Sequence, residues 1–122
     1  MLRGVVLVGV FMVSVAAVAG PLPSRADKAA ITQWAVQTLV DPYSLRSTAI
    51  SDVTVVDGRQ IVCVEFNARN NYGGYEGVQR TTFVVTPEGL IHGSRARPVT
   101  TTATCYAAGV VMRPFPELAS IR

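Results

Sequence analysis

The first periodic stretch of the chain has apolar residues at helical spacing. They follow the i, i+3, i+4, i+7, i+8 pattern of a helix with one buried face: Ile31, Trp34, Ala35, Thr38 and Leu39. The pattern predicts a helix that begins at Ser24 or Asp27, both good N-caps, and ends at Leu39-Val40. Asp41 precedes Pro42 and is pushed out of the α region, which stops the helix. Trp34 is expected to be a core residue rather than one that stacks on a ligand.

Downstream, β-branched and aromatic residues gather in short runs typical of strands. Asp57-Gly58 indicates a two-residue hairpin turn between the runs at residues 50–56 and 61–66. This turn pairs Val56 with Arg59. The resulting register puts five apolar residues on one face, where the helix is expected to pack: Val53, Val55, Val62, Val64 and Phe66. The opposite face is mixed, and the segment around Cys105 is expected to cover part of it.

Two more strands are predicted at residues 78–85 and 90–92, joined by a turn that contains proline and glycine. One helix followed by four sequential strands indicates the α+β fold class. The expected architecture is an N-terminal helix packed on a four-stranded antiparallel meander. Residues 20–122 are enough for one core, so we expect a single domain.

The C-terminal segment does not show one clear pattern. Residues 99–104 are β-branched, yet a threonine there could equally cap a short helix through Cys105, and both alternatives stay open. Pro114 and Pro116 predict an extended tail, which Phe115 and Leu118 would anchor to the core. We therefore expect an irregular C-terminal segment.

Residues 1–19 have the features of a secretory signal peptide. Arg3 supplies a positive start, residues 5–18 form an apolar run, and Ala17-Val18-Ala19 is a small-x-small cleavage motif. The alternative is a retained membrane anchor, which needs about 18 to 20 apolar residues. The run is shorter than that, and no cysteine follows it to carry a lipid. We expect a periplasmic or secreted protein without a stable membrane anchor after cleavage.

Cys63 and Cys105 are the only cysteines, and export would place them where thiols oxidise. We expect a disulfide bond between them, which would tie the C-terminal segment to the sheet. The alternatives are two free buried thiols or a thiol nucleophile. The sequence has no C-x-x-C motif, so redox catalysis has little support.

Charge and motifs exclude several classes of partner. The formal net charge is +3, and the basic residues are scattered rather than clustered, so no nucleic-acid partner is expected. Gly73-Gly74 is not a phosphate loop, because no Lys-Ser/Thr follows it. No motif implies a cofactor. A calcium site would need more acidic oxygens than Glu65 and Glu76 supply. The expected role of these two glutamates is cross-strand ion pairing with Arg69 and Arg80.

Two stretches resemble a group of small exported proteins from proteobacteria. These are Leu39-Val40-Asp41-Pro42-Tyr43-Ser44, with its D-P-x-S turn, and residues 62–77, which match V-C-x-x-x-N-A-[KR]-N-x-Y-G-G-Y-x-G. A second cysteine follows downstream in that group and here. The resemblance covers about residues 39–83 and implies export and a shared loop, but no named activity. Many members of the group look like lipoproteins, whereas this chain lacks the lipid-acceptor cysteine.

The loop at residues 67–77 is the best candidate for a contact surface. Its glycines and asparagines allow tight backbone turns, and its two tyrosines supply flat, rigid contact area. The predicted ligand-binding residues are Asn70, Asn71, Tyr72 and Tyr75, with Arg69 and Arg80 at the rim. The alternative is that this loop only shapes a wide hairpin, with both tyrosine rings folded over the sheet.

His92 is the only histidine, so a His-rich metal site is excluded, and a solvent-exposed position at a strand end is expected. No catalytic residue is assigned. The predicted function is a non-enzymatic binding or interaction module of the bacterial envelope, with a protein, peptide or glycan partner. Two alternatives stay open. One is a small hydrolase that uses His92 and a carboxylate; a set of Ser94, His92 and Asp52 or Asp57 can be written for it, although no spacing supports that set. The other is an inhibitor or immunity-type protein whose loop enters an enzyme cleft.

Overall fold

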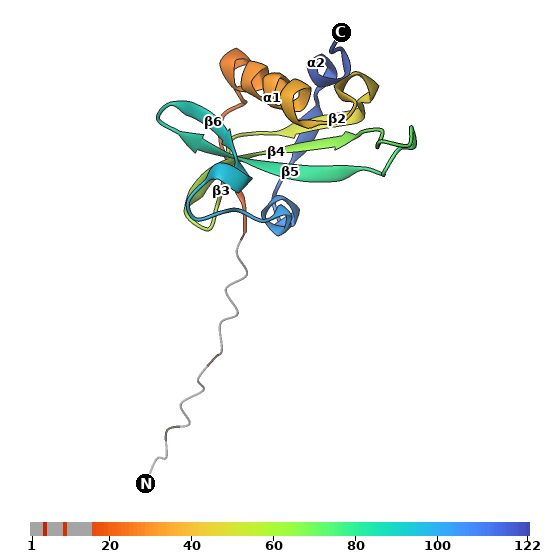
Figure 1. The fold of residues 1–122 in the computed structure, drawn as a ribbon. Coiled ribbons are helices and arrows are strands. Elements are labelled where there is room, and N and C mark those ends of the chain that lie inside the picture. Colours follow the sequence, from red (N-terminus) through yellow and green to blue (C-terminus); the bar gives the residue numbers. More distant parts are fainter. Residues whose placement is uncertain (1–3, 5–8, 10–15) are drawn as a thin grey trace.

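The computed structural model describes residues 4, 9 and 16–122. Within them the chain is mostly β-structure, with seven strands in one curled antiparallel sheet (Figure 1). The strands are β1 (Val18–Ala19), β2 (Arg46–Ser51), β3 (Thr54–Val56), β4 (Arg59–Asn67), β5 (Gln79–Thr86), β6 (Gly89–His92) and β7 (Met112–Pro114). The described helices are α1 (Arg25–Thr38), α2 (Pro116–Ala119) and the 3₁₀ helices η1 (Pro42–Ser44), η2 (Gly93–Arg95) and η3 (Thr102–Tyr106).

The predicted α+β class is wrong, because strands dominate the described chain, and so is the predicted layout of a helix on a four-stranded meander. Strand β4 lies at the centre of the sheet: β5 and then β6 follow on one side, while β2 and β3 share the other side. The sheet continues beyond β2 to β7 and beyond β3 to β1. Strands from near both ends of the described chain therefore extend the sheet. The pattern of consecutive strands does not predict these pairings, because the partners are far apart in the sequence.

The predicted strand at residues 50–56 is broken in two. At the end of β2, the hydroxyl of Ser51 accepts a hydrogen bond from the backbone N–H of Cys63 at 2.8 Å. The next residue, Asp52, is buried, and its carboxylate accepts a hydrogen bond from Nε of Arg113 at 2.9 Å. These side-chain contacts take the place of regular strand pairing at the break.

The expectation of an irregular C-terminal segment is also wrong. Residues of β7 pair with β2, and α2 follows directly with Pro116 at its start. A proline is tolerated at the edge of a sheet and in the first turn of a helix, because neither position needs its backbone N–H. The predicted anchoring of the tail is confirmed, since Phe115 and Leu118 are fully buried in the main core.

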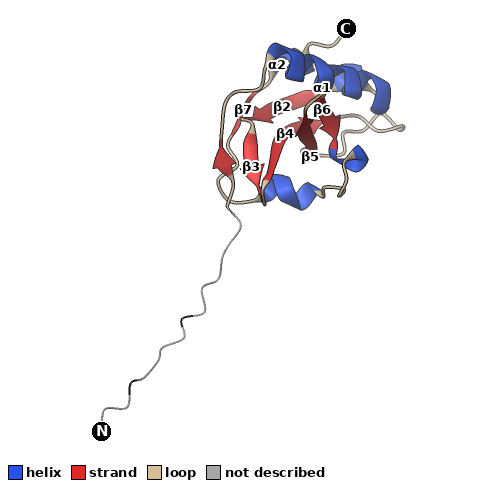
Figure 2. Ribbon diagram, turned by 90° about the vertical axis from the view of Figure 1, so that its left-hand side faces the viewer, coloured by secondary structure: helices blue, strands red, loops and turns tan. Residues whose placement is uncertain are grey.

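Helix α1 is confirmed with its predicted start. Ser24 is the N-cap: its hydroxyl accepts from the backbone N–H of Asp27 at 3.0 Å, and the Asp27 carboxylate accepts from the Ser24 N–H at 3.1 Å. This reciprocal pair is a capping box. Two residues of α1, Ile31 and Ala35, are fully buried in the main core. Trp34 packs against this core, as predicted. Figure 2 shows α1 and α2 above one face of the sheet.

The hairpin register is confirmed at the Asp57-Gly58 turn. Val56 pairs with Arg59, and both turn residues have positive φ, which is the type I′ geometry that suits a two-residue hairpin. Val62, Val64 and Phe66 consequently belong to the main core under α1, whereas Ile61 and Cys63 belong to a second cluster on the opposite face.

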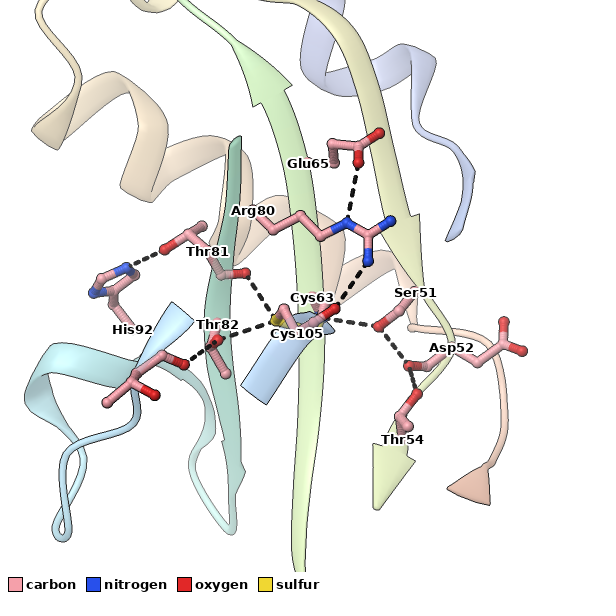
Figure 3. The surroundings of a disulfide bond; sticks show 11 residues. Ser51, Asp52, Thr54, Cys63, Glu65, Arg80, Thr81, Thr82, His92 and Cys105 are labelled. Carbon is pink, nitrogen blue, oxygen red and sulfur yellow. Dashed lines mark hydrogen bonds and ion pairs between the residues drawn. A yellow bond between two sulfur atoms is a disulfide. The ribbon is translucent and has the colours of Figure 1, made fainter. Parts of the chain in front are cut away.

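A disulfide bond joins Cys63 to Cys105, as predicted, and its surroundings are drawn in Figure 3. Both cysteines are fully buried, and Cys105 lies in η3. The segment that contains Cys105 therefore covers the mixed face of the sheet, which was expected. Disulfides persist in oxidising compartments, so this bond fits an extracellular location.

Residues 1–3, 5–8 and 10–15 of the predicted signal peptide lie outside the described residues. Its last residues form β1, in which Val18 pairs with Val55 and Ala19 with Thr54. Cleavage after Ala19 would therefore remove β1 from the edge of β3. The helices of the described part of the chain include none long and apolar enough to cross a membrane.

Candidate functional site

The loop between β4 and β5 is built around the side chain of Asn70. Its Oδ1 accepts hydrogen bonds from the backbone N–H groups of Tyr72 at 2.9 Å and Gly74 at 3.2 Å. The Asn70 backbone completes the turn, since its N–H donates to the Gly74 carbonyl and its carbonyl accepts from Gly73 N–H. Gly73 has a φ of +79°, a value that glycine adopts without strain. The loop is therefore held by its own hydrogen bonds in one conformation.

The base of the loop is attached to η1. The hydroxyl of Tyr75 donates to the Ser44 carbonyl at 2.8 Å, and Ser44 Oγ accepts from the Arg69 backbone N–H at 3.0 Å. The Arg46 guanidinium lies 3.5 Å from the centre of the Tyr75 ring, and that of Arg69 lies 5.3 Å from it. Such cation–π contacts fix the ring further. Tyr75 therefore anchors the base of the loop to η1, and its ring is engaged in contacts within the protein.

Tyr72 has the opposite environment. Its side chain is 96% exposed at the tip of the loop, and Asn71 beside it is exposed as well. In Figure 1 this tip projects from the end of the β4–β5 hairpin, away from the body of the sheet. A small hollow of about 130 Å³ lies beside the tip, and Val40, Arg69 and Asn71 are among the residues that line it. Tyr72 and Asn71 at the end of the loop and Arg69 nearer its base are all exposed, and we call these three residues the loop tip.

Arg80, predicted at the rim of the loop, has other partners. Its Nε donates to Glu65 at 3.0 Å, which confirms the expected cross-strand ion pair, and its Nη1 donates to the Cys105 carbonyl at 2.9 Å (Figure 3). Its guanidinium also lies 5.0 Å from the centre of the Tyr106 ring. Arg80 therefore joins the sheet to η3 beside the disulfide. The ligand-binding role of all six predicted residues remains a prediction.

His92 is not the exposed strand-end residue that the sequence predicts, because it is partly buried under α1. Its ring stacks on Trp34, with centres 4.9 Å apart and planes 10° apart. Nε2 lies 2.7 Å from the Thr81 hydroxyl and Nδ1 lies 2.8 Å from the Ser94 hydroxyl. Both ring nitrogens thus contact hydroxyls rather than the carboxylate that a hydrolase of the expected kind would use.

Neither aspartate that was considered as the third member of a Ser-His-Asp set contacts His92. Asp52 is bonded to Arg113, and Asp57 is an exposed turn residue. The part of the chain that the structure describes contains no group of three or more His, Cys, Asp or Glu side chains placed to bind a metal ion.

Protonation of His92 is expected to destabilise the fold. Burial, and then repulsion from the Arg95 guanidinium, lower the pKa of His92 from 6.5. Below pH 6.5 the unfolded chain therefore binds more protons than the folded chain, and the unfolding free energy falls as the pH drops toward the folded-state pKa. Urea denaturation at pH 7.5 and 5.5 measures this loss.

The matched control for the pH experiment is His92→Gln, which keeps a polar side chain but does not titrate. We expect the unfolding free energy of the variant to change less between pH 7.5 and 5.5 than that of the wild type, whatever its stability at either pH. Equal changes in both proteins would show that His92 does not titrate with a lowered pKa.

Comparison of the chain with protein-family models, with curated proteins and with solved structures finds no match.

Proposed function

We propose that this protein is an exported recognition module that binds a protein partner of the bacterial envelope through the loop tip. The observation that carries the proposal is Tyr72, whose side chain is almost fully exposed on a loop that is stabilised by its own hydrogen bonds. An exposed aromatic ring adds no packing energy to the fold. On a preorganised loop it supplies contact area at little cost in conformational entropy.

The composition and shape of the loop tip favour a protein partner over a glycan or a small molecule. Tyrosine and arginine are enriched at the energetic centres of protein interfaces. The hollow lined by Arg69 and Asn71, at about 130 Å³, is well below the roughly 300–1,000 Å³ of pockets for small molecules. It is of a size for one side chain of a partner, lined by the apolar Leu39 and Val40 as well as by polar residues.

Export is part of the proposal for two reasons. The features of residues 1–19 are those of a secretory signal. The buried disulfide between Cys63 and Cys105 is of a kind that forms and persists mainly in oxidising compartments. The resemblance to small exported proteins of proteobacteria agrees with this location.

Tyr72→Ala is expected to abolish capture of the partner without changing the fold. A tyrosine at an interface centre contributes about 2 kcal/mol or more, which is a loss of roughly 30-fold in affinity. The measurement is a pull-down from envelope extract with the oxidised domain as bait, followed by titration of the captured protein. Circular dichroism of each variant checks its fold.

Tyr43→Ala is the matched control, because Tyr43 is also exposed, at 62%, but does not belong to the loop tip. A partner retained by the wild type and by Tyr43→Ala, and lost by Tyr72→Ala, supports the proposal. Equal retention by all three proteins, or capture of nothing by any of them, would contradict it.

A further inference from the structure

A cavity of about 530 Å³ lies between α1 and β6, apart from the loop tip. Gln33, Trp34 and Gln37 line it from α1, while His92, Ser94 and Arg95 line it from the end of β6 and from η2. The volume lies within the roughly 300–1,000 Å³ typical of pockets that bind small molecules. Sequence reasoning did not find this site, because its two sides are far apart in the chain.

Three aromatic rings hold one another in place at this cavity. The Trp34 and His92 rings are stacked, and the Phe83 ring meets them edge-on, with centres 5.3 Å from Trp34 and 5.4 Å from His92. The contacts of His92 with Thr81 and Ser94 occupy both of its nitrogens. His92 therefore contributes a fixed flat ring to the wall. Flat apolar groups pack well against such rings.

Charge at the cavity has one sign. Arg95 is the one lining residue with a full charge at neutral pH, and no carboxylate is among the lining residues. None of the ion pairs found among residues 16–122 involves Arg95. A cationic ligand would meet repulsion there, whereas a carboxylate could accept two parallel hydrogen bonds from the guanidinium.

We propose that this cavity binds a small organic acid, with its carboxylate on Arg95 and its flat apolar body against the aromatic rings of Trp34, Phe83 and His92. The amides of Gln33 and Gln37, one turn apart on α1, supply further hydrogen-bonding groups at the opening. This proposal is independent of the loop tip.

The test uses benzoate as the probe and Trp34 as the reporter. Trp34 is the only tryptophan, so its indole N–H gives one cross-peak in a proton–nitrogen correlation spectrum. We expect benzoate to shift this peak saturably. Acetate, which has the charge but no ring, and benzyl alcohol, which has the ring but no charge, should each need at least about tenfold higher concentrations.

Two arginine variants distinguish a direct contact between Arg95 and the carboxylate from a general effect of positive charge. Arg95→Gln is expected to weaken benzoate binding about tenfold. Arg97→Gln removes a neighbouring charge that does not line the cavity, and should leave binding unchanged. Absence of a saturable shift, equal binding of benzoate and benzyl alcohol, or an affinity within twofold of the wild type in Arg95→Gln would overturn the proposal. Tyr72→Ala should bind benzoate like the wild type, so failure of one proposal leaves the other standing.

Discussion

Replacing Phe115 with alanine is expected to lower the unfolding free energy by about 3–5 kcal/mol. The Phe115 side chain is fully buried in the main core. Its backbone N–H donates to the Thr48 carbonyl at 3.1 Å, and its carbonyl accepts from the Thr48 hydroxyl at 2.7 Å. These bonds hold the backbone of residue 115 in place, so the core cannot easily collapse into the space that alanine would leave. Small domains have only about 5–15 kcal/mol of stability, so this loss is large.

Urea denaturation of Phe115→Ala and of the wild type measures this loss. The matched control is Val111→Ala, a substitution four positions earlier in the same segment at a side chain that is 49% exposed. We expect the control to stay within about 1 kcal/mol of the wild type. A loss of less than about 1 kcal/mol in Phe115→Ala would mean that the C-terminal segment is not part of the core.

The second large effect is expected for the disulfide. Cys63 and Cys105 are 42 positions apart, and closing a loop of this length stabilises a folded chain by about 4 kcal/mol on the chain-entropy estimate. The bond also attaches η3 to β4 in the second hydrophobic cluster. We therefore expect the double variant Cys63→Ala/Cys105→Ala to lose up to about 4 kcal/mol of unfolding free energy.

Denaturation with and without a reducing agent gives the control for the disulfide. Reduction should destabilise the wild type by a similar amount and leave the double variant unchanged, since the variant has no bond to break. If the double variant were as stable as the oxidised wild type, the bond would not constrain the unfolded chain as this account requires.

Local signals predicted those elements whose structure depends on neighbouring residues. The capping residues Ser24 and Asp27 identify the start of α1, and Asp57-Gly58 sets the register of the β3–β4 hairpin. The strand break before Thr54 was not predictable in the same way. At this break Asp52 contacts Arg113, which lies 61 positions away in the sequence, and no local pattern indicates that contact.

The C-terminal elements are not predictable from local patterns, because prolines at this spacing are typical of an irregular tail. Pro114 lies in β7 at the edge of the sheet, and Pro116 starts α2, and both positions tolerate proline. Only pairing with β2 makes residues 112–114 a strand. That pairing partner lies far away in the sequence, so no local pattern indicates it.

The sequence predicts that residues 67–77 form a loop, but it does not predict which residue of the loop is exposed and which supports it. The Asn and Gly content of residues 67–77 indicated a tightly turned segment, which the structure contains. Which tyrosine is free depends on Ser44, whose carbonyl binds the hydroxyl of Tyr75 and leaves Tyr72 exposed. The place of Arg80 beside Cys105 likewise depends on how η3 folds back over the sheet.

We propose above all that the exposed ring of Tyr72 contacts a partner in the cell envelope. The most direct measurement is photo-cross-linking in living cells, with photo-reactive benzoylphenylalanine substituted at position 72 in one strain and at position 43 in another. The account predicts one discrete adduct of higher mass from position 72 and none from position 43. Irradiation that gives no adduct from position 72, or the same adducts from both positions, would contradict it.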